Sequence, residues 1–301
     1  MNNKRNKMDF YEWICFFFIG IVCFLFIMGF FEAILMMDYT IYAKIPITLG
    51  ACWVLLLSFR KFLTMYTRVK AKIFATPQHD VKILLTGWGV SFLFFGTIMA
   101  SLYCLNVYQP QKINCDIQNQ LYGWLLFAVV GIGEEIICRG IAFRLLCDRI
   151  GMIWALIVSA LFFGFAHIFN DGANVWSALA IAVTSGWLLG VAYGYYQSLW
   201  APIGMHWAWN YLEGYVFGCP VSGAFIQHPI ITSRLFGPTW LTGGSFGPEA
   251  SIAAILIGVV ISLYYTLKLK QKRTTKGSSV PPSRCPPVSP APLYGKNRPR
   301  R

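Results

Sequence analysis

Residues 121–146, LYGWLLFAVVGIGEEIICRGIAFRLL, form a long apolar stretch that is interrupted near its middle by charged side chains. Glu134 and Glu135 are adjacent, and Arg139 follows Glu135 by four positions. A charged side chain at the depth of a lipid bilayer costs at least about 2.5 kcal/mol. The stretch is long enough to cross a membrane, so three such side chains indicate a buried ion pair, an ion path or catalysis.

The composition of the whole chain is that of a membrane protein. Hydrophobic residues make up 56% of the 301 residues and charged residues only 12%, against roughly 25% charged in a soluble domain. The sequence therefore predicts an all-α, polytopic transmembrane helix bundle with about eight spans. Apolar windows of suitable length lie at 13–37, 41–66, 83–107, 121–147, 153–169, 174–195, 198–217 and 250–267.

The distribution of basic residues predicts the orientation of these spans. With both termini in the cytoplasm, 21 of the 25 Lys and Arg residues lie on the cytoplasmic side, as the positive-inside rule requires. Only Lys44, Lys112 and Arg234 lie outside. We expect no nucleic-acid partner, because the basic residues flank the spans and do not line one face. They are expected instead to attract anionic lipid headgroups.

The chain divides into a transmembrane domain, residues 1–270, and a tail, residues 271–301. The tail is rich in Pro, Ser and Arg and has little to bury, so we expect it to be disordered and cytoplasmic. Within the window at 174–195, Gly186, Gly190 and Gly194 recur every four residues. This spacing lets a neighbouring helix approach closely, so we expect this glycine ladder to pack against another span.

Helical spacing separates the two glutamates of the central stretch. Residues four apart share one face of a helix, so Glu135 and Arg139 can form a buried ion pair. Glu134 points about 100° away from Glu135 and is free to face a cavity. A carboxylate in that position is suited to taking a proton from water and returning it. On this segment alone, a purely structural polar cluster explains the charges equally well.

Two further spans each carry a histidine. His167 follows Phe163 by four positions, and His206 and Asn210 also lie four apart. Taken singly, the first favours a core histidine and the second an interhelical hydrogen bond. A rise of about 1.5 Å per residue places Glu134 and His206 halfway across the membrane and His167 somewhat further out. Together these side chains offer a base, an imidazole and a paired set of donors.

Three short motifs carry a resemblance to a known family. EEIICR at 134–139, FGFAH at 163–167 and HWAWN at 206–210 resemble, in this order, the EExxxR, FxxxH and HxxxN/D motifs of the CAAX-protease and bacteriocin-processing (CPBP, or Abi) family of intramembrane endopeptidases. EExxxR alone is a weak pattern, whereas all three on separate spans form a strong one. The resemblance covers residues 120–215.

The resemblance implies a role for each matched residue. Glu134, helped by His167, is expected to activate a water molecule for attack on the scissile carbonyl. His206 and Asn210 are expected to donate hydrogen bonds to the developing oxyanion. Structural support for the site is expected from Glu135, Arg139 and Phe163.

The residues leave metal dependence open. Glu134, His167 and His206 could supply three ligands to a catalytic zinc ion, with water as the fourth. The sequence contains no HExxH pair, and the resemblance favours glutamate-based hydrolysis without a metal. We therefore expect no cofactor, with zinc as the alternative.

These observations predict an intramembrane endopeptidase of the glutamic type that hydrolyses a peptide bond in a peptide or membrane-anchored protein substrate. The alternative is a non-catalytic membrane scaffold or bacteriocin-immunity factor of the same family, in which the motifs serve stability. A proton-coupled transporter that uses the charges of 134–139 is a weaker hypothesis, since no internal repeat is evident. We expect a multi-pass integral protein of a bacterial-type plasma membrane; the sequence identifies neither a prenyl group on the substrate nor an oligomeric state.

Overall fold

The computed structural model describes residues 8–68 and 76–275, and within them the chain is mostly helical, as predicted. Each predicted apolar window coincides with one helix or one continuous helical run. The first four are α1 (Phe10–Met36), α2 (Ile41–Thr67), α3 (Pro77–Cys104), and α4 (Ile117–Glu135) continued by η1 (Ile136–Phe143) and α5 (Arg144–Ile150). The others are α6 (Met152–Ala166), α7 (Val175–Ile181) with η2 (Ala182–Trp187) and α8 (Leu188–Tyr196), α9 (Trp200–Tyr211) with η3 (Leu212–Val216), and α11 (Ile252–Thr275).

Not every helical run is long and apolar enough to cross a membrane. Among the described residues, five are: Phe10–Met36, Ile41–Thr67, Gln78–Cys104, Val175–Tyr196 and Ile252–Lys272. The apolar helix α6 has 15 residues, which extend only about 22 Å. The chain is thus a helical protein with several candidate spans, while the count of eight and the cytoplasmic location of both termini stay predictions.

The expected boundary between membrane domain and tail, at residue 270, stays a prediction. Helix α11 continues to Thr275, so a boundary at residue 270 falls inside this helix. The apolar periodicity of the sequence fades at Lys268, but a helix does not have to end where its apolar face ends. The predicted disorder of the remaining tail concerns residues 276–301, which lie outside the described part of the chain.

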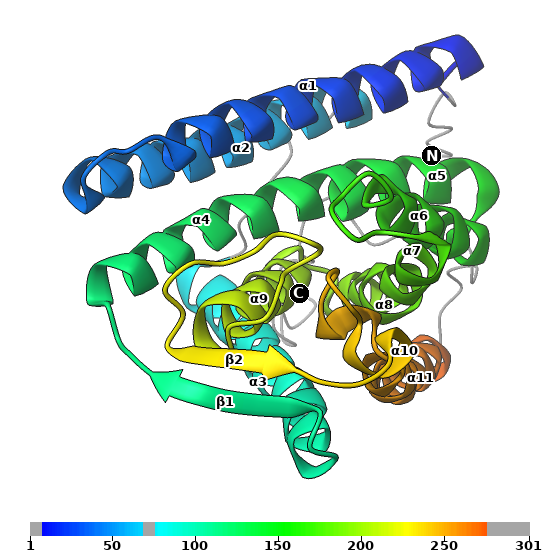
Figure 1. The fold of residues 1–301 in the computed structure, drawn as a ribbon. Coiled ribbons are helices and arrows are strands. Elements are labelled where there is room, and N and C mark those ends of the chain that lie inside the picture. The colour runs from blue at the N-terminus through cyan, green and yellow to red at the C-terminus, as the bar shows by residue number, and fades with distance from the viewer. Residues whose placement is uncertain (1–7, 69–75, 276–301) are drawn as a thin grey trace, which may run out of the picture.

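Helix α4 occupies the centre of the arrangement. Figure 1 shows α1 and α2 side by side along one side of α4, with the other long helices gathered on its opposite side. Glycines permit the close approaches: a Cβ on Gly133 would meet the Met28 sulfur of α1 at 2.6 Å, and a Cβ on Gly131 would meet Trp207 of α9 at 3.2 Å. These contacts fix the neighbours of the segment that carries Glu134.

The glycine ladder packs against α6. A Cβ on Gly186 would lie 2.8 Å from the Ala160 carbonyl oxygen, and one on Gly190 would lie 2.7 Å from Leu156. Gly194 faces Met152 in the same way. Because α6 ends at the residue before His167, this close packing sets the position of that histidine.

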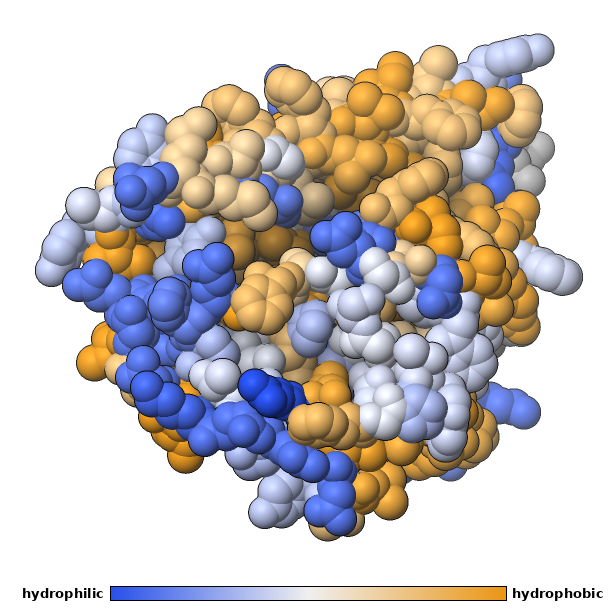
Figure 2. All heavy atoms as spheres, in the orientation of Figure 1, coloured by the Kyte–Doolittle hydropathy of each residue, from blue (hydrophilic) through white to orange (hydrophobic). Residues whose placement is uncertain are grey.

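The outer surfaces of the helices agree with a lipid environment. Figure 2 shows hydrophobic side chains covering the α1–α2 layer and hydrophilic ones over the face that carries the two short strands. On α1 alone, the large apolar side chains of Phe18, Ile19, Val22 and Phe26 are exposed. Exposed apolar surface on this scale is typical of proteins that contact a membrane.

The all-α prediction missed a small two-stranded sheet. Strand β1 (Tyr108–Ile113) pairs antiparallel with β2 (Ile231–Leu235), with an irregularity between Pro110 and Lys112. Pro110 has no backbone N–H to donate, and it is tolerated because β1 is an edge strand of this sheet. After β2 follow α10 (Thr239–Thr242) and η4 (Pro248–Ala250). These short elements belong to the segment that closes one end of the bundle beside the site.

Three helical runs widen into π-helical turns, all within the described residues. They are η1, η2 and η3, and the first and last directly follow Glu135 and Tyr211. A π-helical turn shifts the register of the side chains and often occurs at a functional site. Here η1 directly follows Glu135, η2 accepts a hydrogen bond from Arg139, and η3 begins two residues after Asn210.

Candidate active site

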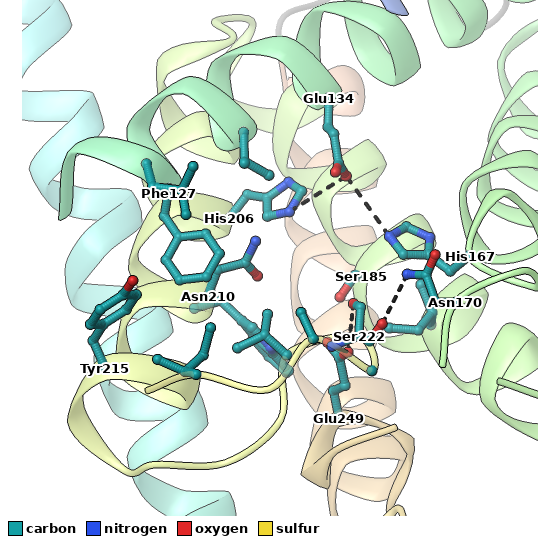
Figure 3. A pocket seen from close by; sticks show the side chains of 18 of the residues that line it. Phe127, Glu134, His167, Asn170, Ser185, His206, Asn210, Tyr215, Ser222 and Glu249 are labelled. Carbon is teal, nitrogen blue, oxygen red and sulfur yellow. Dashed lines mark hydrogen bonds and ion pairs between the residues drawn. The ribbon is translucent and has the colours of Figure 1, made fainter. Parts of the chain in front are cut away.

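A cavity of about 910 Å³ lies between α4, α6 and α9, and its wall includes Glu134, His167, His206 and Asn210. Figure 3 shows these side chains facing one another across the cavity from three different helical runs. Three sequence motifs that are far apart in the chain therefore meet at one place. A cavity of this size can hold several residues of a peptide.

Glu134 lies at the C-terminal end of α4, with its side chain 22% exposed toward the cavity. Its Oε2 atom is 3.7 Å from His206 Nε2 and 4.0 Å from His167 Nε2. Both separations exceed a direct hydrogen bond. They are short enough for one water molecule to bridge the carboxylate and either imidazole.

His167 is oriented by the helix that precedes it. Its Nδ1 atom lies 2.8 Å from the carbonyl oxygen of Phe163, one turn earlier. Since a carbonyl can only accept, Nδ1 carries the hydrogen, and in the neutral ring Nε2 is the acceptor. That acceptor faces Glu134. The Phe163 ring packs edge-on against the imidazole, with 5.0 Å between ring centroids.

Glu135 is fully buried and bonds to two side chains through one oxygen. Its Oε1 accepts from Arg139 Nη1 at 2.7 Å and from His206 Nδ1 at 2.9 Å. The contact with Arg139 follows from helical spacing. The contact with His206 crosses between helices, so nothing in the sequence spacing could reveal it.

Arg139 connects the central helix to two neighbours. Its Nη2 atom donates to the carbonyl oxygens of Ser185 and Gly186 in η2, at 2.9 and 3.1 Å. Its guanidinium group also lies over the Phe163 ring, 4.5 Å from the centroid. A planar cation that bonds and stacks in this way holds several elements in one arrangement.

Asn210 lies one turn after His206 on α9 and is 8% exposed, at the wall of the cavity. The next turn carries Glu213, whose Oε2 accepts from Trp209 Nε1 at 2.8 Å. The amide of Asn210 and the imidazole of His206 thus project from one helix face toward the same space (Figure 3). Such a pair can supply two donors to one oxygen.

A second part of the wall comes from a segment that sequence reasoning missed. Ser222 donates through its backbone nitrogen and its hydroxyl to Oε1 of Glu249, at 2.6 and 2.7 Å. Asn170, just after His167, donates to the Ser222 carbonyl oxygen at 2.8 Å. Burial raises the pKa of Glu249, and the bonds from Ser222 offset only part of that rise. These residues lie outside regular periodic segments, so no pattern in the sequence points to them.

Glu32 of α1 is the other residue that sequence reasoning missed. It lines the same cavity as Glu134. Its signal was visible, because a single acidic residue within an apolar window carries the same energetic cost as Glu134. The sequence around Glu32 matches no motif, so motif patterns do not single it out.

The zinc alternative concerns the donor atoms of Glu134, His167 and His206. Zinc bonds of about 2.0–2.2 Å place neighbouring tetrahedral donors about 3.3–3.6 Å apart. The two imidazoles lie 3.7 and 4.0 Å from Glu134 Oε2, wider than this arrangement. In the described ranges, no group of three His, Cys, Asp or Glu side chains is arranged to hold a metal ion. The residues are of the right type for zinc and their spacing in this structure is slightly wider than a zinc site, so the expectation of no cofactor stays a prediction.

Comparison with protein families found one match. Residues 117–212 match the family described as Rce1-like, type II CAAX prenyl endopeptidase Rce1-like. This match covers the three motifs and confirms the resemblance to the CPBP family. A search of curated proteins and a search of solved structures found no match. The family and the apolar helices together support an integral membrane protein of the CAAX-protease type, acting on a peptide or protein substrate; a non-catalytic scaffold is not favoured.

Proposed function

We propose that this protein is an intramembrane endopeptidase that uses Glu134 and His167 to activate water, and His206 and Asn210 to stabilise the oxyanion. The observation that carries the proposal is the meeting of these side chains at one cavity, within the segment that matches the endopeptidase family. The substrate is a peptide or a membrane-anchored protein. The membrane is proposed to be a bacterial-type plasma membrane with anionic headgroups beside the basic loops.

The first step is the activation of water. Ionised Glu134 and the Nε2 atom of neutral His167 are both acceptors, and they face each other at 4.0 Å. A water molecule between them can donate one hydrogen to each, which leaves a lone pair on its oxygen for attack. As the oxygen bonds to the scissile carbonyl carbon, its proton moves to Glu134.

The second step is the stabilisation of the negative charge on the former carbonyl oxygen. For donation through Nε2, His206 must also carry a proton there, because Nδ1 already donates to Glu135. The cation that results lies between two carboxylates, which favour it. The side-chain amide of Asn210 supplies a second donor. Removal of one donor from such a site commonly lowers the rate a hundredfold or more.

The third step completes the hydrolysis. The tetrahedral intermediate collapses as the C–N bond breaks, and the leaving nitrogen takes the proton that Glu134 received from water. The products are an amine and a carboxylic acid, and Glu134 is again ionised. No covalent acyl-enzyme is required. Glu134 is the one residue that gains and then loses a proton during the cycle.

The proposal is tested with the full chain purified into liposomes and incubated with a library of apolar peptides. Mass spectrometry should detect new cleavage products with wild type and none with Glu134→Ala of equal thermal stability. Cleavage by Glu134→Ala at the wild-type rate rejects the proposal. In parallel, activity that is lost with a chelator and restored by zinc would reject the metal-free route.

A further inference from the structure

Glu32 belongs to a part of the cavity that the matched family segment does not include. It lies on α1, and the match begins only at residue 117. The contact between Met28 and Gly133 holds α1 against the end of α4 that carries Glu134. Glu32 follows Met28 by one helical turn and lines the cavity, so α1 adds a carboxyl group to a wall built mainly by other helices.

Unlike Glu135 and Glu249, Glu32 has a carboxyl group without a compensating partner among the described residues. Glu135 pairs with Arg139, and Glu249 accepts two hydrogen bonds from Ser222. For Glu32, no hydrogen bond or ion pair is formed with any residue in the described ranges, while the charge of Glu134 acts on it unfavourably. An acid in an apolar helix is costly without a counter-charge, so the missing partner points to something that enters the cavity.

Apart from its histidines, of which His206 is already paired with Glu135, the ionisable side chains of the cavity wall are mainly acidic. Its acidic side chains are Glu32, Glu134, Asp171 and Glu249, and the described part of the wall contains no Lys or Arg. A concave, low-dielectric surface with one sign of charge concentrates groups of the opposite charge. The cavity is therefore suited to a substrate that carries a positive group and poorly suited to one that carries an additional negative group.

We propose that Glu32 is a specificity-determining residue that binds a cationic side chain, Lys or Arg, of the peptide substrate. The inference rests on the proposed endopeptidase function and names its substrate class. Glu32 takes no part in the bond-breaking step.

The test compares matched peptides that differ only at one position of an otherwise apolar sequence, which carries Lys, norleucine or Glu. Hydrolysis is measured with wild type, Glu32→Gln and Glu32→Lys in liposomes. Glu12→Gln is the control, because Glu12 lies on the same helix but pairs with Arg68 at the surface. Binding of the same labelled peptides to Glu134→Gln is measured separately, so that affinity is known even without cleavage.

Wild type and Glu12→Gln should prefer the Lys peptide over the norleucine peptide by about tenfold in kcat/KM, the size of one charge-assisted hydrogen bond. Glu32→Gln should bring that ratio near one, and Glu32→Lys should favour the Glu peptide. An unchanged ratio in Glu32→Gln overturns the inference, since glutamine imitates a neutral, protonated glutamate. If wild type cleaves nothing, the endopeptidase proposal fails, and the binding ratio still decides whether Glu32 selects a cation.

Discussion

Glu135 accepts hydrogen bonds from Arg139 and His206 through a single buried oxygen. This arrangement directs Nδ1 of His206 toward Glu135 and leaves Nε2 facing the cavity. Helical spacing alone predicted the contact between Glu135 and Arg139. The contact between Glu135 and His206 joins residues 71 positions apart, and only the packing of α9 on α4 brings them together.

Replacing Glu135 with Gln should lower kcat while leaving KM nearly unchanged. The neutral amide still accepts a hydrogen bond from His206 but no longer stabilises its positive charge, and a charge-assisted bond is about twice as strong as a neutral one. We expect a loss of about tenfold in kcat, measured by initial rates at saturating peptide. A rise in KM with unchanged kcat would show that Glu135 acts on substrate binding instead.

Glu249 should make folding stability depend on pH. Burial raises the pKa of its carboxyl group, so the folded protein holds this proton more tightly than the unfolded chain does. Its contribution to stability is therefore fully present below the ordinary pKa of 4.5 and is lost as the pH rises through the folded pKa. Thermal unfolding between pH 4 and pH 8 should show wild type losing stability relative to Glu249→Gln as the pH rises. A constant difference between the two proteins would contradict this assignment.

At the scale of elements, the apolar windows of the sequence predicted the positions of the long helices well. Hydrophobicity and length determine these helices, and both can be counted directly. The π-helical turns could not be predicted, because apolar windows give the length of a helical run but not the hydrogen-bond register within it. The pairing of β1 with β2 was also missed. The two strands are far apart in the sequence, and neither one alternates clearly between apolar and polar residues.

The glycine ladder offers a test at this scale. Gly186→Ala should destabilise the protein by about 1–3 kcal/mol, the usual cost of overpacking, because the new Cβ would press on the backbone of Ala160 in α6. Gly96→Ala in α3 is the matched control, since its Cβ would meet nothing within 4 Å. Thermal unfolding of both variants measures the effect. Equal stability of the two would mean that the close approach of these helices contributes little.

At the scale of the whole molecule, the sequence predicted a membrane protein and the meeting of three motifs, and the family match covers the same segment. The wall formed by Ser222 and Glu249 could not be foreseen, because it depends on how an irregular segment folds over the bundle end. The number of spans is a further open prediction. It depends on how the shorter runs, such as α6, sit in the bilayer.

The predicted orientation can be tested with a native thiol. Cys115 is free and exposed between β1 and α4, on the side predicted to be outside. A membrane-impermeant maleimide added to intact cells should label Cys115 in wild type. This label should be missing from Cys115→Ser. Tags at the two chain ends should become accessible only after permeabilisation. Labelling of Cys115 only in permeabilised cells, or tags on opposite sides, would refute the predicted topology.

The most direct test of the central claim is a double-mutant measurement of kcat with Glu134→Gln, His167→Ala and the two changes combined. Residues that activate the same water act as a unit, so their effects are not independent. Glu134→Gln should lower kcat by about a hundredfold or more, and adding His167→Ala should lower it little further. If the two losses multiply instead, the two side chains do not act on one water, and the account of this cavity as a hydrolytic site is contradicted.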